Sequence, residues 1–538
     1  MNLENHIIII NGVDKTYQVE FIRLDGYKYA IKFQNTDKIY SYSRDNVLWL
    51  TNPTSIDFDN CHVLVNGKKE KNIQAIHLFA NNAEKYYAIT YGNGFIKHYS
   101  GNEVDIRRSC LNGQATNVFD YLQQCAGINT IGVNEEDESS GGILSSVYSR
   151  ISFIDEETAA AVYMNPHQGL KRYCDNSTLF PFGCNASQMR AVKIALTNQI
   201  SVIQGPPGTG KTQTILNIIA NLLKDRKSVL VVSNNNSATE NVLEKLSKNG
   251  LGFLVAPLGK KENKEAFIAN QPPLNPELPT WHKTAMDTNR ASREVKDSVD
   301  KVEKIFNMQE RLAICHQELA EVKIEMFHYR QEQPDKFSNK EVKTPSSRIL
   351  KILGRIKNFS IKYQHDSKDF LLRLKCLLSK FSLELRLRLL FDIKDELSTE
   401  SIPRIISLLD WMFYIRRVHE LKSEIDDLET HLSQLNAEAL MKSLTESSMT
   451  VLKASLFQRY KKERPIIDSV KDLFDNGESV LADYPIILST TFSSRTCFNS
   501  DTLFDYVIMD EASQVSVETG LLALTCARNA VIVGDTMQ

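Results

Sequence analysis

A phosphate-binding pattern is the clearest chemical feature of the sequence. Gly205 to Thr212 read GPPGTGKT, which fits G-x-x-x-x-G-K-[ST] without a mismatch. In such a loop the glycines let backbone N–H groups turn toward phosphate oxygens at a helix N-terminus. Lys211 would reach the β and γ phosphates of ATP, and the Thr212 hydroxyl would ligate Mg²⁺. The nucleotide-binding residues predicted from this stretch are Gly205, Pro206, Pro207, Gly208, Thr209, Gly210, Lys211 and Thr212.

Two adjacent acids, Asp510 and Glu511, follow an apolar stretch that is typical of a buried strand. Asp510 could share the Mg²⁺ with Thr212, and Glu511 could polarise the water that attacks the γ-phosphate. The alternative is a strand end with ordinary surface acids. It is disfavoured because a second strand ends in Gly-Asp-Thr-Met-Gln, which offers the amide of Gln538 near the same edge. The predicted catalytic residues are Lys211, Asp510, Glu511 and Gln538, with Thr212 and Asp510 as metal ligands.

Polar residues follow two further predicted strands. Ser233 ends the predicted strand at residues 228–233 and is followed by Asn234 to Asn236. Thr490-Thr491 come after residues 486–489. Hydroxyl and amide groups beside helix N-termini suit a nucleic-acid backbone. A capped helix start is the alternative, but it explains one asparagine and not three. The predicted nucleic-acid contacts are Ser233, Asn234, Asn235, Asn236, Thr490 and Thr491.

Gln188 lies about one helix before the phosphate loop, in a segment where Asn185 or Ser187 can cap that helix. A glutamine amide can bind an adenine edge with a paired donor and acceptor. Its spacing from the loop makes Gln188 a candidate nucleotide-binding residue. The residue type alone would not.

The elements that must position these residues alternate between strand and helix. Residues 200–203 read as a buried strand, and residues after Thr212 carry apolar side chains at helical spacing up to Lys224. Residues 252–259 read as a third strand with its turn. The polar residues at the strand ends are those expected at the ligand-binding edge of an open parallel sheet. The sequence therefore predicts an α/β fold, a P-loop NTPase with a RecA-like parallel sheet.

Residues 260–480 break this alternation with two stripes of apolar residues at steps of three and four, which predict an antiparallel coiled-coil arm. The middle of the arm, residues 336–390, holds fourteen lysines and arginines against four acids. A basic tip could bind nucleic acid. It could equally be a solvated helical face or a protein-docking site. The two stripes are Val302, Ile305, Met308, Leu312, Cys315, Leu319, Val322 and Met326, and Val418, Leu421, Ile425, Leu428, Leu432, Leu435 and Ala439.

The N-terminal part of the chain is predicted to be rich in strands and turns, forming a small β-barrel or sandwich. Its aromatic residues alternate with lysines such as Lys28, Lys32 and Lys38 and could stack on bases, although filling a small core is the commoner role. Helices are expected after residue 110, with Val118, Tyr121 and Leu122 on one face. Residues 134–142 read as an exposed acidic loop. The predicted domains are 1–110 (β-rich, barrel-like), 111–180 (helical linker), 181–259 and 481–538 (the two halves of the RecA-like domain) and 260–480 (the helical insertion).

Composition limits the class of protein. The formal net charge is −2, so a nucleic-acid surface would have to be local. The nine cysteines include no Cys-x-x-Cys pair, which argues against that type of zinc site and fits a reducing compartment. No signal peptide and no apolar run of membrane-spanning length is found. We expect a cytoplasmic protein without a membrane partner.

The sequence resembles the superfamily 1 helicases of the Upf1/Dna2 kind, in a bacterial multidomain version. The pieces that carry the resemblance are NASQ, GPPGTGKT, SNNNSATENVLEKL, LSTT, DEASQ and GDTMQ, in the family's order. The resemblance implies ATP and Mg²⁺ as cofactors and binding of ATP at Gln188, Gly205 to Thr212, Asp510, Glu511 and Gln538. It also implies that a single strand of DNA or RNA is the partner, and that the arm or the N-terminal β domain could bind a protein.

Such motors need a second RecA-like domain, whose arginines complete the ATP site. The sequence stops at Gln538, inside the motif that precedes it. We therefore expect a fragment of a longer helicase or one half of a split protein, with weak nucleotide binding and slow hydrolysis by this part alone.

Two other functions stay open. One is a coiled-coil ATPase of the chromosome-maintenance type, which would need a serine-glycine-glycine signature before the acidic strand. Leu488 to Arg495 contain no glycine. The other is a nucleotide-gated binding module that does not translocate.

Overall fold

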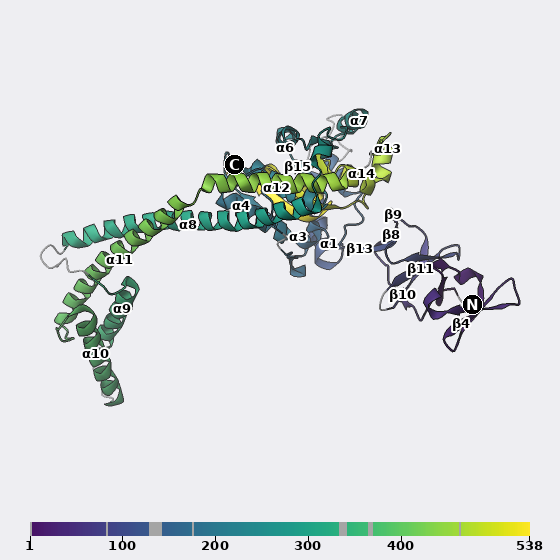
Figure 1. The fold of residues 1–538 in the computed structure, drawn as a ribbon. Helices are drawn as coiled ribbons and strands as arrows, with labels where there is room; N and C mark the ends of the chain where they lie inside the picture. Colours follow the sequence, from purple (N-terminus) through teal and green to yellow (C-terminus); the bar gives the residue numbers. More distant parts are fainter. Residues whose placement is uncertain are drawn as a thin grey trace. The chain divides into compact units, whose positions relative to one another are not determined.

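The structure is a computed structural model that describes residues 3–81, 84–128, 142–174, 177–332, 342–363, 370–461 and 464–537. The predicted acidic loop at 134–142 lies outside these residues except for Gly142. The chain forms two compact units (Figure 1). The sheet unit comprises Met1–Arg293 and Thr445–Gln538, and the arm unit comprises Glu294–Leu444. No helix in the described part of the chain is long and apolar enough to cross a membrane.

The N-terminal residues form small antiparallel sheets, as the alternation of apolar and polar residues predicts. Most of the aromatic side chains, among them Tyr29, Phe33 and Trp49, pack against the apolar cores, whereas Tyr27 at the β3–β4 turn is 89% exposed. The sheets are β2-β1-β6 (Val13–Asp14, His6–Ile10, Val47–Thr51), β3-β4-β5 (Val19–Asp25, Lys28–Phe33, Ile39–Ser43), β12-β11-β10-β7 (Ile96–Ser100, Lys85–Tyr91, Ile73–Ala80, Thr54–Ser55) and β13-β8-β9 (Val104–Arg108, Cys61–Val65, Lys68–Lys69).

Three helices follow, α1 (Gly113–Ile128), α2 (Ile143–Tyr148) and α3 (Ala159–Met164), and they share an apolar core with α15 (Val517–Leu524). Leu122 is buried in this core, but Tyr121 is 65% exposed. The predicted face of Val118, Tyr121 and Leu122 is therefore buried only in part. The buried residues of α1 follow a row four, three and four residues apart, from Ala115 to Ala126, and Tyr121 lies beside that row.

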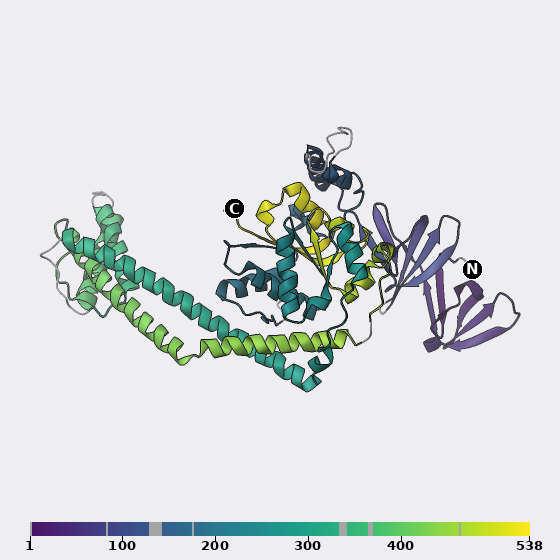
Figure 2. The same cartoon turned by 90° about the horizontal axis from the view of Figure 1, so that it is seen from above.

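A six-stranded parallel sheet is the centre of the sheet unit, as predicted, with strand order β14-β19-β18-β15-β17-β16. Strands from before and after the helical insertion are interleaved in it, as the teal and yellow strands in Figure 2 show. All carboxyl ends therefore lie at one edge. The strands are β14 (Ile200–Gln204), β15 (Val229–Ser233), β16 (Val255–Pro257), β17 (Ile486–Thr490), β18 (Phe504–Met509) and β19 (Ala527–Gly534), and the helices of this region are α4 (Ala186–Thr197), α5 (Lys211–Lys224), α6 (Asn236–Lys248), α7 (Lys261–Ala269), α13 (Val470–Asp475) and α14 (Gly477–Asp483).

Two details of the sheet differ from the sequence prediction. The strand before the phosphate loop, β14, is an edge strand, and its Val202 is 73% exposed rather than buried. Residues 252–259 begin with a short 3₁₀ helix, Gly252–Leu254, so the third strand is only three residues long. Both details depend on which strands become neighbours, which local sequence does not report.

The arm contains helices α8 (Ala285–Glu332) and α11 (Ser401–Gln434), which pack along an apolar seam (Figure 1). Cys315, Leu319, Leu421 and Ile425 form the centre of that seam, as the two stripes predict. Arg311 donates to both carboxylate oxygens of Glu424 at 2.6 and 3.0 Å. Farther along α8, Glu318 pairs with Arg417, which lies earlier in α11. The pairing runs in opposite directions along the two helices, so the predicted antiparallel coiled coil is confirmed.

The second stripe ends earlier than predicted. α11 stops at Gln434 and α12 (Ala437–Arg459) begins a new helix, so Leu435 and Ala439 do not continue the seam. Leu435 has an extended backbone and is 38% exposed. The tip holds α9 (Ser346–Tyr363) and α10 (Phe370–Phe391), which form a second apolar core with α11.

Candidate nucleotide-binding site

The phosphate loop connects β14 to α5 with the conformation that its glycines permit. Gly208 and Gly210 have φ values of +84° and +83°, which L side chains rarely adopt. A Cβ at Gly205 would lie 2.7 Å from Thr209 Oγ1. Lys211 donates its ammonium to the carbonyl of Gly205 at 2.7 Å. The loop therefore holds its own lysine across the space in which phosphate oxygens would be bound.

Gln188 is 7% exposed and fastens the loop from the side of α4. Its Oε1 accepts the N–H of Asn185 at 3.0 Å while Asn185 caps the helix by accepting the Gln188 N–H. Its Nε2 donates to the carbonyl of Thr209 at 3.1 Å. A Cβ at Gly210 would overlap the Gln188 amide. Gln188 thus has a positioning role in this structure, and its predicted contact with adenine stays a prediction.

Three amide side chains on α5, at Gln213, Asn217 and Asn221, hold the segment that leads to Gln188. Asn217, fully buried, accepts the N–H of Phe182 at 3.2 Å and donates to the carbonyl of Gly183 at 2.8 Å. Asn221 bonds both backbone groups of Leu179 at 2.8 Å, and Gln213 donates to the carbonyl of Phe182 at 2.6 Å. The sequence prediction missed these residues. Their spacing of four on an otherwise apolar helix is the signal that could have found them.

Asp510 lies directly after β18 and is 6% exposed. Burial raises the pKa of its carboxyl group, while the Glu511 N–H, at 2.9 Å from Oδ1, and the ammonium of Lys211 act in the opposite direction. The structure therefore brings Asp510 into the electrostatic range of the phosphate-loop lysine, although the two residues are 299 positions apart in the sequence by their numbers.

Glu511 has a backbone φ of +53°, in the left-handed region that a glutamate rarely occupies. Its Oε2 is buried and has no hydrogen-bond partner among the described residues. Such strain and such an unsatisfied oxygen each carry a free-energy cost, and both cluster at functional sites.

The donors present at the site fit Mg²⁺ bound together with phosphates. Thr212 lies in the first turn of α5, and Asp510 supplies a carboxylate. Within the described part of the chain no group of three or more His, Cys, Asp or Glu residues could hold a metal ion. Mg²⁺ commonly uses one or two protein oxygens and takes the remainder from water and phosphate, so a single carboxylate and a hydroxyl are sufficient.

The ends of β15 and β17 bring the predicted nucleic-acid residues together. Asn234 accepts a hydrogen bond from the hydroxyl of Thr491 and donates to the carbonyl of Gln514 at 2.8 Å. Ser233 and Thr491 are fully buried, backbone groups included, so neither is accessible in this structure.

The remaining predicted residues of this edge serve local structure. Asn235 caps α6 by accepting the N–H of Ser237 at 3.1 Å, and Asn236 is the first residue of α6. Thr490 accepts the N–H of Ser493 at 3.3 Å. Gln538 lies outside the described residues. Near it, Asp535 is 4% exposed and accepts the N–H of Met537 at 2.9 Å.

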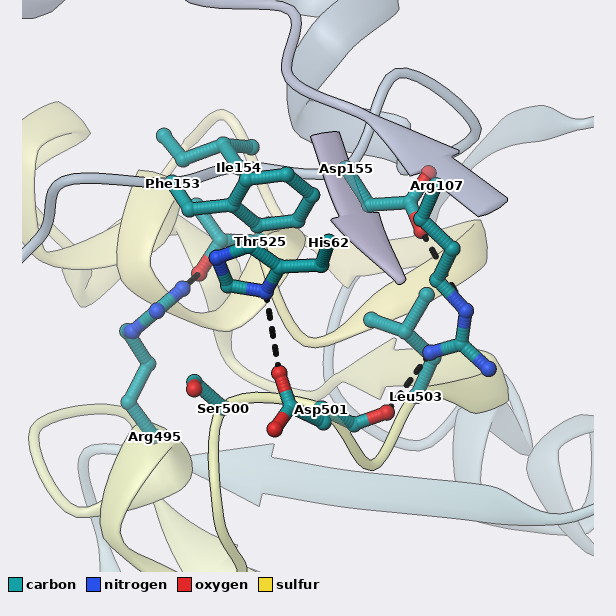
Figure 3. A pocket seen from close by; sticks show the side chains of 10 residues that line it. All are labelled: His62, Arg107, Phe153, Ile154, Asp155, Arg495, Ser500, Asp501, Leu503 and Thr525. Atoms are coloured by element: carbon teal, nitrogen blue, oxygen red, sulfur yellow. Dashed lines mark hydrogen bonds and ion pairs between the residues drawn. The ribbon is translucent and has the colours of Figure 1, made fainter. Parts of the chain in front are cut away.

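A polar junction joins the β domain to the loop after β17, as Figure 3 shows. His62 lies 3.0 Å from Asp501 and stacks on Phe153 with ring centroids 3.6 Å apart. Arg107 donates to the Asp501 carbonyl at 2.6 Å and approaches Asp155 at 3.9 Å. The hydrogen bond from His62 lowers the pKa of Asp501, and burial raises that of Asp155. The loop that follows Thr490-Thr491 is thereby tied to the β domain.

Comparison with known proteins agrees with this geometry. Residues 183–538, more than half of the chain, match the family described as AAA domain. The chain is 42% identical over 85 residues to Regulator of nonsense transcripts 1 of Caenorhabditis elegans, covering 16% of this chain and 8% of that protein. It is 44% identical over 68 residues to DNA polymerase alpha-associated DNA helicase A of Schizosaccharomyces pombe, covering 12% and 10%. It is 33% identical over 123 residues to ATP-dependent helicase upf1 of the same yeast, covering 20% and 13%. The chain thus spans only a small part of the length of these relatives.

Proposed function

We propose that this chain is an ATP-binding motor domain that couples ATP hydrolysis to movement on DNA or RNA. The premise is that the chain belongs to the AAA domain family and is a Upf1-like superfamily 1 helicase. The observation that carries the proposal is the arrangement at the sheet edge. A complete phosphate loop lies near a buried aspartate, and the next residue is a strained glutamate with an unsatisfied oxygen.

Each residue has a distinct role in the proposed reaction. Lys211 would exchange the Gly205 carbonyl for phosphate oxygens. Thr212 and Asp510 would hold Mg²⁺, which neutralises the developing charge on the phosphates. Glu511 would accept the proton of the attacking water. Its Oε2, which has no partner among the described residues, would accept the hydrogen bond from that water. We also propose that Gln188 and Gln538 contact the nucleotide.

The nucleic acid would bind along the ends of β15 and β17. Asn234 and Asn235 are exposed there and Thr490 is half-buried. Asn236 would continue the row, whereas Ser233 and Thr491 are buried and would have to become accessible. Asn234 is supported from behind by Thr491 and Gln514. Contacts of this kind position a strand without reading its sequence, so they fit both DNA and RNA. The scattered free cysteines support a cytoplasmic location as part of the proposal.

The test measures nucleotide binding and ATP hydrolysis with and without single-stranded DNA or RNA. Glu511→Gln keeps the size of the side chain and should lower the hydrolysis rate by about 10²- to 10⁴-fold while a fluorescent ATP analogue still binds. Lys211→Ala should weaken binding itself.

The matched controls are Glu244→Gln and Lys248→Ala, which form an exposed ion pair on α6 and should change neither quantity. Full activity in Glu511→Gln would overturn the assignment of the base. Hydrolysis that ignores both DNA and RNA, with nucleotide binding intact, would favour a nucleotide-gated binding module without translocation.

A further inference from the structure

The outward face of α10, at the tip of the arm, is covered with apolar side chains that nothing in the described structure buries. They are spaced by three or four residues, so they form one row along the helix. Together they expose apolar surface on the order of several hundred Å², which is as large as the largest patch of an ordinary soluble protein. The row consists of Leu374 (44% exposed), Leu377 (64%), Leu378 (62%), Phe381 (67%), Leu385 (47%) and Leu389 (74%).

The opposite face of α10 is apolar too. Leu383 and Leu387 are buried there, in the core that α10 shares with α9 and α11 (Figure 1). α10 is therefore apolar on two opposite faces, and the described residues cover only one of them. A helix that is apolar on all sides is normally buried on all sides. The folding of the tip explains the inner face and leaves the outer face without a structural role.

Basic side chains border the exposed row. At 100° per residue Lys375 and Arg386 fall along one border, Lys380 along the other, and Arg388 near the row itself. Among the described residues of α9 and α10 the only acid is Glu384, and it is paired with Lys380 at 3.7 Å. Along α10 the borders of the row are thus mainly basic, while Asp392, Asp395 and Glu396 follow the helix.

The shaft of the same arm shows which partner such a surface fits. There the apolar seam of α8 and α11 is bordered by arginine–glutamate pairs, Arg311 with Glu424 and Arg417 with Glu318. In the shaft each helix supplies one arginine and one glutamate, whereas the outer face of α10 has an apolar row with mainly cationic borders. The surface that complements it is an apolar row with acidic borders.

Other occupants fit this surface less well. A second copy of the chain would place lysines and arginines opposite one another, because α10 would meet its own charge. A nucleic acid would neutralise the basic borders but would leave six large apolar side chains in contact with water and phosphate. A bilayer would take the leucines, yet α10 is held by its inner face, so it cannot lie freely at the interface as amphipathic membrane helices do.

We propose that the outer face of α10 is a docking surface for an amphipathic α-helix of a partner protein, whose apolar row is bordered by aspartate or glutamate. The interaction is of the helix-to-helix type, in which residues at i, i+3, i+4 and i+7 anchor the contact. It is independent of the nucleotide site, so it holds whether or not the motor proposal is correct.

The test uses the full chain and a fluorescent synthetic helix of about 21 residues with leucine at the a and d positions and glutamate at the flanking positions. Binding is followed by fluorescence anisotropy. We expect saturable binding that the triple variant Leu378→Gln, Phe381→Ser, Leu385→Gln weakens by roughly tenfold or more. The matched control is Ile324→Gln with Phe327→Ser, two exposed apolar residues of α8, which should leave the affinity unchanged.

A second variant keeps the apolar row and reverses the charge of its borders, Lys375→Glu with Arg388→Glu. It should weaken the glutamate peptide and strengthen a peptide with lysine in place of glutamate, a change that loss of folding cannot produce. The proposal is overturned if the glutamate peptide does not bind, or if neither α10 variant alters its affinity.

Three further measurements separate the other occupants. The same α10 variants are tested with vesicles of phosphatidylglycerol, with a single-stranded oligonucleotide of about 20 nucleotides, and for self-association by light scattering. If the triple variant abolishes vesicle binding, oligonucleotide binding or self-association while the peptide affinity stays the same, the partner is of that class and the proposal is wrong.

Discussion

The nucleotide site and the tip of the arm use opposite kinds of side chain. At the sheet edge polar groups are held in place by hydrogen bonds: Gln188 donates to the phosphate loop and Lys211 donates to the Gly205 carbonyl. One oxygen of Glu511 has no partner among the described residues. On α10 six large apolar side chains are exposed to solvent. A small charged ligand is bound by groups held in advance at fixed positions. A surface for a macromolecule can be spread over several turns of helix. The first should therefore be sensitive to single substitutions and the second should be tolerant of them.

The largest effect is expected for Gly210→Ala. The added Cβ would overlap the Gln188 amide, and the φ of +83° is unfavourable for alanine. Binding of a fluorescent ATP analogue should weaken by about 100-fold or more, since the loop and Gln188 must both move. Binding within a few fold of the wild type would show that the site is as tolerant as the tip.

The next test compares the substitution of one buried residue near the nucleotide site with that of one buried residue in the tip of the arm. Asn217→Ala removes two buried hydrogen bonds to residues 182–183, and Leu387→Ala removes a fully buried side chain from the tip core. Each should lower the free energy of unfolding by about 2–4 kcal/mol in urea titrations. Only Asn217→Ala should also weaken nucleotide binding. Equal effects of both on binding would mean that the amide row does not position the site.

Asp510→Asn should raise the melting temperature of the nucleotide-free protein at neutral pH. Burial raises the pKa of Asp510 in the folded state, so its ionised form destabilises folding. That cost is absent below the ordinary carboxyl pKa of about 3.9 and is complete above the raised folded value. The gain should therefore shrink as the pH is lowered. With Mg²⁺ and ATP the order should reverse, and a Glu244→Gln control should show neither change.

A smaller effect is expected at the junction between the β domain and the sheet. Asp501→Asn should lower the free energy of unfolding by about 1–2 kcal/mol at pH 7, because it replaces a charged hydrogen-bond acceptor of His62. The hydrogen bond lowers the pKa of Asp501 in the folded state. Its contribution is therefore present above about pH 4 and is lost as the pH falls through the folded pKa. Asp475→Asn, at an exposed position on α13, is the control.

The smallest effect tests the tolerance of the tip. Gly354 lies within α9, and a Cβ there would meet nothing within 4 Å. Gly354→Ala should raise the stability of the arm by about 0.5–1 kcal/mol and leave nucleotide binding unchanged, the opposite of Gly210→Ala. A loss of stability would show that α9 has a constraint that the structure does not reveal.

The parts of the fold that follow from local chemistry could be predicted from the sequence. The phosphate loop depends on glycines and one lysine that are adjacent in the chain, and the arm depends on a repeating apolar period, so both were identified correctly. The acidic pair was recognised because it ends an apolar strand. The strained backbone of Glu511 could not be predicted, because nothing about a glutamate residue indicates that its φ will be positive.

Features that depend on distant neighbours could not be predicted. Nothing in residues 200–203 indicates that β14 forms the edge of the sheet and exposes Val202. The basic middle of the arm left nucleic acid and protein docking equally open, because periodicity reports which residues are apolar and not which of them stay uncovered. The exposed row on α10, on which we base the proposal of a protein partner, can be recognised only once the core of the tip is known.

The order of strands in the sheet has a consequence for how the protein is made. Among the described residues β14 pairs only with β19, the latest of the six strands in sequence order, and β15 pairs with β17 and β18, which follow the arm. During synthesis the strand that precedes the phosphate loop therefore has no partner strand until after the arm has been produced. The arm's helices rest on contacts within and between neighbouring helices and can form early. The residues that we propose to bind nucleotide leave the ribosome well before the sheet that holds them is complete.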